Sequence, residues 1–211
     1  MPTIFEDDFN SYNDGDLIGQ GGWEQVPGYN GNEVQGVVVM EGAKAVKLVS
    51  NTDVSLIQAK DGASAISPGR LTVYFKATGH TNWATNAFVT IARIGETGAW
   101  DARFQVMAKQ NGKFYYWDPG LNEIEFGTFS DDQWYCIEIE WRGSGADSEV
   151  RYRINGGTWT SWVAPYRDWT NGLKWWGFGS AHNLNNNPAY IDYIAEYPYT
   201  PPVGKSRGYI F

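Results

Sequence analysis

Apolar and polar residues alternate along most of the chain, with the period of two that is typical of half-buried β-strands. Residues 71–76 and 103–108 show this alternation most simply, and a helical period is almost absent. Regular turn signals separate the alternating segments, which favours an antiparallel sandwich of about a dozen strands. Further strands are predicted over residues 37–40, 45–49, 54–58, 88–94, 114–117 and 175–180.

Residues 129–162 give the clearest pattern, because two alternating segments, residues 135–141 and 149–154, flank a loop at residues 143–147. In an antiparallel register, Glu138 and Glu140 would face Arg151 and Arg153 on the polar side. Such cross-strand pairs contribute only about 0.2–1 kcal/mol each, but they help to fix the register. Two further turns are predicted where Asn and Gly tolerate positive φ, at Asn111-Gly112 and Asn155-Gly156.

The two ends of the chain carry segments of matching character. Residues 3–10 and 189–197 both alternate, and both place a carboxylate within the strand. We predict that they pair with each other and close one sandwich domain over residues 1–197. Residues 198–211 then form an extended, Pro-rich tail with an apolar tip. We expect the tip to dock, either on its own domain or on a neighbouring subunit or partner; its residues are Tyr209, Ile210 and Phe211.

The amino-acid composition and net charge limit the classes of function that this protein can have. The 11 Trp, 13 Tyr and 10 Phe can fill a large core, because each buried ring removes about 150–250 Å² from water. The net charge of −8 and the lack of a Lys/Arg run argue against binding to nucleic acid or an anionic membrane surface. No apolar run is long enough for insertion into a membrane. The single cysteine, Cys136, excludes an intramolecular disulfide, and we expect an inert, half-buried thiol.

The start of the chain lacks the pattern of a secretory signal, since Met1 is followed almost at once by acidic residues 6–8. We therefore expect synthesis in the cytoplasm without export by the usual route. The expected location is a virion surface or an extracellular site reached without a signal peptide.

Several motifs together resemble the concanavalin A-like, laminin-G-like jelly-roll superfamily. They are residues 7–10 (DDFN) with Gly22-Trp23, residues 132–141 (DQWYCIEIEW), residues 150–157 (VRYRINGG) and residues 190–194 (YIDYI). The resemblance covers about residues 3–197 and implies an all-β, antiparallel jelly-roll β-sandwich. The superfamily includes lectins, carbohydrate-binding modules, glycoside hydrolases, polysaccharide lyases and domains on phage particles, so the fold alone does not set the function.

Two enzyme classes can be tested on the residues. Glycoside hydrolysis needs two carboxylates across one sugar bond, and the nearest match is Glu123 with Glu125, two acids on one strand face. A third acid of the laminarinase-type pattern is missing. Tyr74-Phe75-Lys76-Ala77 is similar to a segment of alginate lyases, but the Arg-rich and Gln-x-His partner motifs are absent. His80 and His182 are expected to be surface residues.

Calcium is the cofactor that the resemblance implies. Many jelly-roll binding modules hold this ion between the first and last strands, and Asp8 and Asp192 occupy such positions by resemblance. Asp14 and Asp16 lie close to Asp8 in sequence. Carboxylate oxygens in loops suit calcium, although Asp14-Gly15 also reads as a simple turn.

A cluster of tryptophans predicts a carbohydrate site, because aromatic rings stack on the apolar faces of sugars. The predicted residues are Trp159, Trp162, Arg167, Asp168, Trp169, Asn171 and Trp176. Trp175 and Trp176 are consecutive in a strand, so one should face the core and the other the solvent. Two alternatives stay open: most of these rings belong to the core, or the cluster is a protein interface.

Three functional classes follow. The leading hypothesis is a non-catalytic surface module on the outside of a virus-like particle, such as a capsid decoration or tail-associated protein, with glycan binding as a further role. Its partners would be a capsid or other particle protein, or a second copy bound through the tail. The alternatives are a stand-alone lectin-like module, and a hydrolase or lyase that cleaves glycans.

Overall fold

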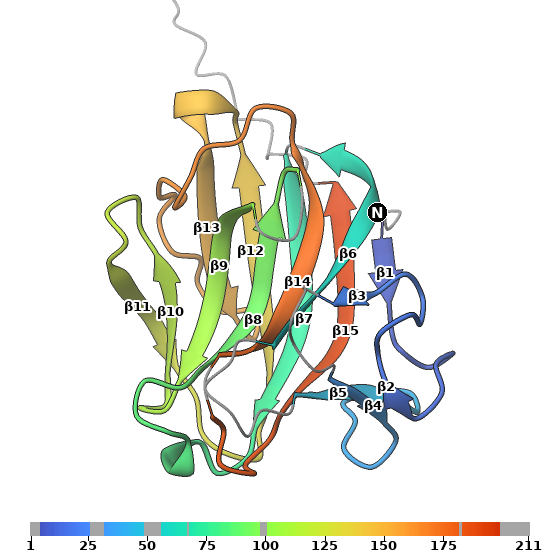
Figure 1. Cartoon of the computed structure of the whole chain (residues 1–211). Coiled ribbons are helices and arrows are strands. Elements are labelled where there is room, and N and C mark those ends of the chain that lie inside the picture. The colour runs from blue at the N-terminus through green and yellow to red at the C-terminus, as the bar shows by residue number, and fades with distance from the viewer. Residues whose placement is uncertain are drawn as a thin grey trace, which may run out of the picture.

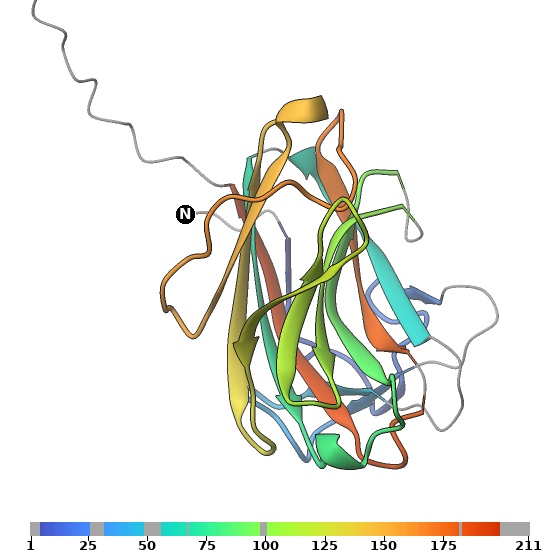
Figure 2. The same ribbon diagram turned by 90° about the vertical axis from the view of Figure 1, so that its left-hand side faces the viewer.

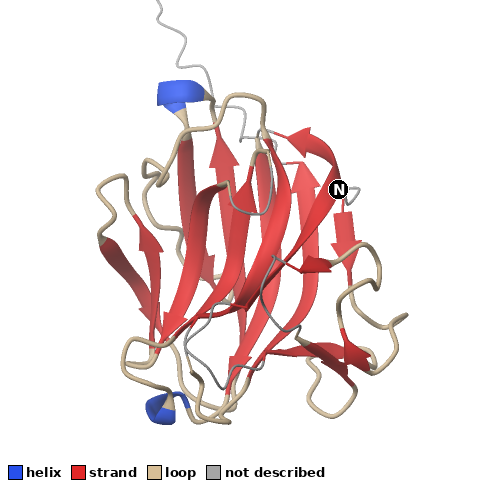
Figure 3. Ribbon diagram, viewed as in Figure 1, coloured by secondary structure: helices blue, strands red, loops and turns tan. Residues whose placement is uncertain are grey.

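Two antiparallel β-sheets packed face to face form the fold (Figure 1). This computed structural model describes residues 5–25, 32–48, 56–66, 68–97, 101–181 and 183–198. Figure 2, turned by 90°, shows the sheets as two adjacent layers. Apart from strands, the described residues contain two 3₁₀ helices, η1 (His80–Asn82) and η2 (Gly145–Asp147), each three residues long (Figure 3). The predicted all-β sandwich is confirmed.

The first sheet has eight strands. In spatial order they are β13 (Glu149–Ile154), β12 (Trp134–Arg142), β7 (Gly69–Ala77), β15 (Ala189–Pro198), β5 (Ala45–Leu48), β4 (Glu33–Gln35) and β2 (Gly15–Asp16), with β1 (Phe5–Asp7) pairing with β15.

The second sheet has seven strands and faces the viewer in Figure 1. Its order is β11 (Glu123–Thr128), β10 (Lys113–Trp117), β9 (Ala102–Lys109), β8 (Phe88–Gly95), β14 (Leu173–Ala181), β6 (Leu56–Ile66) and β3 (Glu24–Gln25).

The first and last described strands pair, as the sequence predicts. In the antiparallel register of β1 and β15, Phe5 lies opposite Glu196 and Asp7 lies opposite Ile194. The Asp7 carboxylate accepts hydrogen bonds from Tyr12 Oη (2.6 Å) and Trp23 Nε1 (2.8 Å). The strand carboxylate therefore links β1 to the loop that follows it.

Aromatic side chains fill the space between the sheets. Trp23, Trp83, Trp141 and Phe104 are almost fully buried, and the rings of Phe104 and Trp141 lie 6.0 Å apart. Burial of this many rings removes enough apolar surface from water to drive folding without a disulfide. One small apolar cavity of about 10 Å³ lies between the sheets, beside Trp176.

The predicted pairing of residues 135–141 with residues 149–154 is confirmed. Glu138 lies opposite Arg153 and Glu140 opposite Arg151 in the register of β12 with β13. Asn155 and Gly156 follow with φ of 51° and 67°, as their turn requires.

The prediction of a strand over residues 37–40 is wrong. These residues form a loop, and Gln35 Oε1 accepts hydrogen bonds from the backbone N–H groups of Val37 (2.7 Å) and Val38 (2.8 Å). Val37 is 89% exposed. The side-chain hydrogen bonds take up the donors that a neighbouring strand would otherwise need to satisfy.

No helix in the described part of the chain has the length and apolar character to cross a membrane. Of the predicted tail, only Pro198, the last residue of β15, lies within the described residues.

Candidate functional site

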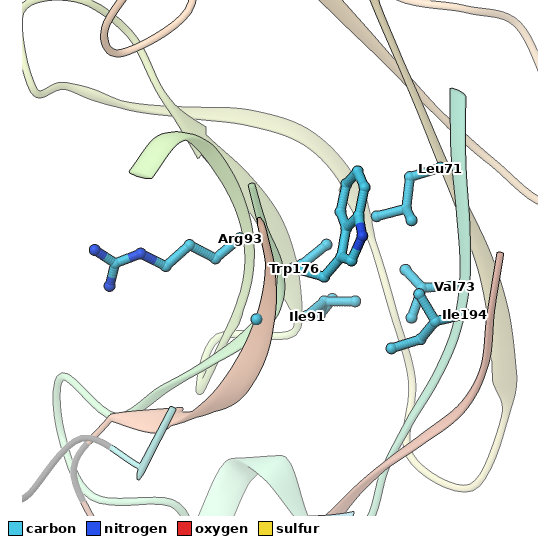
Figure 4. A pocket seen from close by; sticks show the side chains of 8 residues that line it. Leu71, Val73, Ile91, Arg93, Trp176 and Ile194 are labelled. Carbon is cyan, nitrogen blue, oxygen red and sulfur yellow. The ribbon is translucent and has the colours of Figure 1, made fainter. Parts of the chain in front are cut away.

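The outer face of the seven-stranded sheet, the face turned away from the core, carries the chemistry of greatest interest. One row of register partners across it is Gln105 in β9, Arg93 in β8 and Gly177 in β14. Figure 4 shows that Arg93 points away from the interior cavity, whereas Trp176 points toward it. Arg93 lies opposite Gly177, the residue after Trp176, so alternation along β14 places Trp176 on the other face of the sheet from Arg93.

A second row runs beside the first. It joins Tyr115 in β10, Met107 in β9, Thr90 in β8 and Gly179 in β14. Although Thr90 and Met107 face away from the core, they are only 2% and 0% exposed. The residues at the centre of this outer face are therefore buried, and Thr90 is a polar residue among them.

Around these buried residues lie aromatic and guanidinium side chains that keep part of their surface open to solvent. The outer-face cluster consists of Arg93, Tyr115, Trp117, Tyr166, Arg167 and Trp175; Arg167 is exposed and the other five are half-buried. Aromatic rings beside a few oriented polar groups are the usual composition of sites for small organic ligands.

Tyr166 contacts two members of the cluster, Trp117 and Arg167. The rings of Trp117 and Tyr166 meet edge to face, 5.7 Å apart. The Arg167 guanidinium lies 4.8 Å from the centre of the Tyr166 ring and donates a hydrogen bond of 3.0 Å to its hydroxyl. Burial lowers the pKa of Arg93; Tyr166 and Asp101 oppose this shift, and the charge of Arg167 adds to it. Trp117, Tyr166 and Arg167 therefore form a chain of direct contacts.

A hydrogen-bonded network holds the neighbouring segment, residues 166–171, against the sheet. Arg103 pairs with Glu96 (2.9 Å) and Asp101 (2.8 Å). Glu96 Oε1 accepts hydrogen bonds from the backbone N–H groups of Thr170 (3.0 Å) and Asn171 (2.7 Å). Burial would raise the pKa of Asp101, but hydrogen bonds from Thr97 and Arg103 hold it below its usual value. The network fixes Tyr166 and Arg167 relative to the strands.

The predicted carbohydrate residues separate into three groups because residues 157–172 cross from one sheet to the other (Figure 2). Arg167, Asp168 and Asn171 reach the seven-stranded sheet. The backbone N–H of Arg167 donates to Arg103 O (3.1 Å), and the backbone carbonyl of Asp168 accepts from Arg103. Arg167 is a member of the outer-face cluster, and Asp168 and Asn171 follow it closely in the chain.

Trp169 and Trp176 lie in the core, with exposed fractions of 0% and 2%. Trp169 Nε1 donates to Gly143 O (3.0 Å), and the Trp176 ring lies 6.3 Å from Phe5. Since neither ring has a face open to a ligand, the prediction that they stack on a sugar is wrong for these two. Trp175, the neighbour of Trp176, faces outward instead.

Trp159 and Trp162 lie on the outer face of the eight-stranded sheet, among arginines. The Arg151 guanidinium contacts both rings, 4.7 Å from the centre of Trp159 and 4.5 Å from that of Trp162. Arg153 also contacts Trp159 (4.5 Å), and Arg142 contacts Trp162 (4.1 Å). Contacts of this kind contribute about 0.5–2 kcal/mol each, so the two rings serve stability whether or not they also contact a ligand.

Glu123 and Glu125, the predicted catalytic pair, lie on the edge strand β11. Glu123 pairs with Lys109 (2.7 Å) and Glu125 with Lys113 (2.6 Å). Both carboxylates are exposed and each has its own lysine. Tyr74, the first residue of the segment that is similar to one in alginate lyases, faces outward on β7, in the other sheet.

The four aspartates predicted to hold calcium do not converge. Asp192 is buried and its Oδ2 accepts from the backbone N–H of Met40 (2.7 Å). Asp8 Oδ2 accepts from Asn10 Nδ2 (2.9 Å), Asp16 accepts from the Ile18 N–H (3.0 Å), and Asp14 pairs with Lys44. Among the described residues there is no group of three or more His, Cys, Asp and Glu arranged for a metal. The predicted grouping is therefore wrong.

Three remaining predictions have different outcomes. The Cys136 thiol is half-buried as expected, and burial raises its pKa to about 11, which keeps it protonated and unreactive. His80 is not a simple surface residue, because its Nδ1 lies 2.8 Å from Asp131 Oδ1 and its ring lies 4.8 Å from that of Phe129. His182 and the tail residues Tyr209, Ile210 and Phe211 lie outside the described residues.

Of the outer-face cluster, only Arg167 was among the predicted site residues. Sequence reasoning did not assign Arg93, Tyr115, Trp117, Tyr166 or Trp175 to the site, although it expected one of Trp175 and Trp176 to face the solvent. Alternation in β14 contained the signal for Trp175, since Trp176 and Phe178 share the apolar period. The others come together through the contact of residues 166–171 with the sheet, which strand periodicity does not encode.

No family model matches the sequence, and no curated protein matches it either. Solved structures do match. A sialidase superposes with a TM-score of 0.66 at 10% identity over 92% of this chain, which spans 18% of that sialidase's length. The alginate lyase vAL-1 from Chlorella virus gives a TM-score of 0.54 at 16% identity, over 80% of this chain and 93% of the lyase.

A lectin-type domain is also similar. The carbohydrate recognition domain of Emp47p gives a TM-score of 0.52 at 13% identity, over 88% of this chain and 94% of that domain. At these identities the likeness establishes the fold. The chain is a concanavalin A-like β-sandwich, in a fold that enzymes and lectin-type domains share.

Proposed function

We propose that this domain is a non-catalytic glycan-binding module, and that its ligand lies on the outer-face cluster of the seven-stranded sheet. The observation that carries the proposal is the set of half-buried rings of Tyr115, Trp117, Tyr166 and Trp175 on one face. Large aromatic rings on a single soluble domain are normally buried, and those left open at a surface mark sites of interaction. Stacking on sugar rings suits their flat, partly apolar shape.

The polar groups beside the rings complete such a site. Arg93 and Arg167 bring N–H donors to the same face as the rings. Sugar hydroxyls and ring oxygens accept from such donors, which gives orientation in addition to stacking. The likeness to the Emp47p carbohydrate recognition domain supports a glycan as the ligand class.

The non-catalytic part of the proposal rests on Glu123 and Glu125. A glycosidase needs one carboxyl group that stays protonated and one that stays ionised, each in its own environment. Here the two carboxylates have nearly the same environment, an exposed strand edge with one lysine each. Arranged in this way, they do not divide into an acid and a base.

An oligosaccharide array tests the proposal. We expect the full chain to bind a subset of glycans, and Trp175→Ala to lose at least about 1 kcal/mol of binding free energy, in the range measured for stacked aromatic pairs. The matched control is Trp162→Ala, which removes a ring from the other sheet. Equal loss in both variants, or no binding by the wild type to any glycan, would contradict the proposal.

The likeness to an alginate lyase calls for a second readout. Each glycan that binds is incubated with the protein, and its chain length is then measured. Unchanged length supports a binding module. Shortening that Glu125→Gln abolishes would instead establish the hydrolase alternative, and shortening with an unsaturated product would establish a lyase.

The narrower role on the surface of a virus-like particle stays a prediction, because residues 199–211 lie outside the described part of the chain. The native mass of the full chain beside a version that ends at Pro202 tests it. Assembly of the full chain alone would support a docking tail. Monomers in both cases would show that the tail does not drive self-association, and would count against a docking tail.

A further inference from the structure

The spacing of the aromatic rings in the outer-face cluster indicates the size of the glycan and the direction in which it lies, and this inference rests on the function proposed above. We infer that the ligand is an extended oligosaccharide of about three or more sugar units, which crosses the strands of the seven-stranded sheet and stacks on Trp117 at one end and on Trp175 at the other. A single terminal sugar would reach only one of these rings.

The first step is that both tryptophans face outward. Burial alternates along β10, and Tyr115 and Trp117 are half-buried on its outer face. In β14 the core residue is Trp176, so its neighbour Trp175 faces outward. Side chains in a sheet stand roughly perpendicular to it, so the spacing of the strands sets the spacing of these rings.

The second step is the distance between the two strands. β9 and β8 lie between β10 and β14, so the rings are separated by the steps from β10 to β9, from β9 to β8 and from β8 to β14. At about 4.8 Å for each step, the separation across the sheet is about 14 Å. A sugar ring is similar in width to the aromatic ring on which it stacks, so one sugar unit cannot contact both Trp117 and Trp175.

The third step concerns the surface between the two ends. One row across the sheet runs from Tyr115 through Met107 and Thr90 to Gly179. Its two middle side chains are almost fully buried, and the glycine has no side chain, so in this row no exposed side chain lies between β10 and β14. A glycine within a strand often marks a place where a ligand approaches closely. A chain of sugars can therefore lie across the strands.

The fourth step is the rigidity of the Trp117 end. The Tyr166 ring meets Trp117 edge to face, 5.7 Å away, and the Arg167 guanidinium lies 4.8 Å from the centre of the Tyr166 ring. The backbone N–H of Arg167 donates to Arg103 O (3.1 Å). Rings that are held in place before binding lose little conformational freedom when a ligand stacks on them. This end can hold one part of the chain while the further sugar units reach Trp175.

The test measures affinity against chain length in the full-length protein. The probes are the di-, tri-, tetra- and hexasaccharides of the cello-, xylo-, manno-, laminari- and alginate series. In at least one series we expect the tetrasaccharide to bind about tenfold more tightly than the disaccharide, with little further gain in the hexasaccharide. A site for two units would give a gain of only about threefold, because a tetrasaccharide offers three overlapping positions for it.

Variants at the two ends identify the rings. Trp117→Ala and Trp175→Ala are each expected to lose this gain, so that the variant binds the disaccharide and the tetrasaccharide with similar affinity. Trp162→Ala removes a ring from the other sheet and is the matched control, which is expected to keep the gain. The wild type gives a readout that no folding defect can disturb: the tetrasaccharide should shift the indole N–H signals of both Trp117 and Trp175 in an NMR titration.

The outcomes separate the two proposals. Equal affinity for the short and long members of every series that binds, with Trp175→Ala still harmful, would overturn the extended ligand and leave a glycan-binding module. A dependence on length that survives both Trp117→Ala and Trp175→Ala would overturn the assignment of these rings. Absence of binding by every series would overturn the extended ligand, and absence of binding by the oligosaccharide array as well would overturn both.

Discussion

Glu196 and Phe5 are register partners where the last described strand meets the first. On its other side, Glu196 lies opposite the core residue Leu71. The Glu196 side chain is fully buried, and within the described residues neither of its carboxyl oxygens has a hydrogen-bond partner. Burial therefore raises the pKa of Glu196 to about 9.

This carboxyl group predicts that stability falls with rising pH. The unfolded chain loses the proton near the ordinary pKa of 4.5, whereas the folded protein keeps it until about pH 9. Between these values the folded state binds more protons, so the free energy of unfolding decreases by up to about 1.4 kcal/mol per pH unit. We expect Glu196→Leu to remove this decrease and to stabilise the protein by several kcal/mol near pH 8, as measured by urea unfolding from about pH 5 to about pH 9.

Glu6 provides the control, because it belongs to β1 but is exposed. Glu6→Gln is expected to keep the pH dependence of the wild type. If the wild type and Glu196→Leu lose stability in parallel as the pH rises, the carboxyl group is ionised in the folded protein and the prediction fails.

Removal of the buried Glu140 side chain is expected to cause a large loss of stability. Its carboxylate is fully buried and accepts from Arg70 Nε (2.8 Å) and Arg151 Nε (2.7 Å). Removing one partner of a buried ion pair costs about 3–5 kcal/mol, because a charge is left without compensation. We expect Glu140→Ala to lower the free energy of unfolding by that amount.

The pair of Glu149 with Arg142 is the comparison, since its side chains are 38% and 39% exposed. Exposed pairs contribute about 0–1 kcal/mol, so Glu149→Ala should cost no more than that in the same urea titration. Similar losses in both variants would mean that burial does not set the importance of these ion pairs.

Trp175 and Trp176 predict opposite effects of the same substitution. Trp176→Ala empties part of the core and should cost about 3–5 kcal/mol of stability. Trp175→Ala removes a half-buried ring and should cost about 1 kcal/mol. Glycan affinity, measured on the folded fraction, should fall in Trp175→Ala and stay within twofold or so in Trp176→Ala. The reverse pattern would show that the two rings are assigned to the wrong faces.

Calcium removal is expected to leave the protein unchanged. Asp8, Asp14, Asp16 and Asp192 each interact with a different part of the chain, so they cannot act as one ligand set without breaking those contacts. The melting temperature should be the same in excess calcium and in excess EDTA. A rise with calcium would reveal a site that the described residues do not form.

Much of the fold is encoded locally. Alternation identifies the face of β12 that carries Glu138 and Glu140, and charge complementarity then gives its register with β13. The shared pattern of the two ends identifies the pairing of β1 with β15. The valine-rich loop after β4 differs from the strand that its sequence predicts, because strand propensity does not show whether a neighbouring strand is present.

The candidate site was harder to predict, because one segment places its aromatic residues in three environments. Trp159, Trp169 and Tyr166 are close in sequence. They lie, respectively, against the outer face of the eight-stranded sheet, in the core, and beside Trp117 of the opposite sheet. That separation depends on the path of residues 157–172 across the sandwich. Composition identifies such a segment as rich in aromatic residues but does not give its path.

The most direct test of glycan binding at the outer-face cluster is an NMR titration of the ¹⁵N-labelled full chain, read at the indole N–H signals. The ligand is the tightest binder from the oligosaccharide array, and each signal is assigned with a Trp→Phe variant. We predict that the signals of Trp117 and Trp175 shift with the ligand, while that of Trp162 on the other sheet does not. Shifts confined to Trp159 and Trp162, with Trp117 and Trp175 unchanged, would contradict the account.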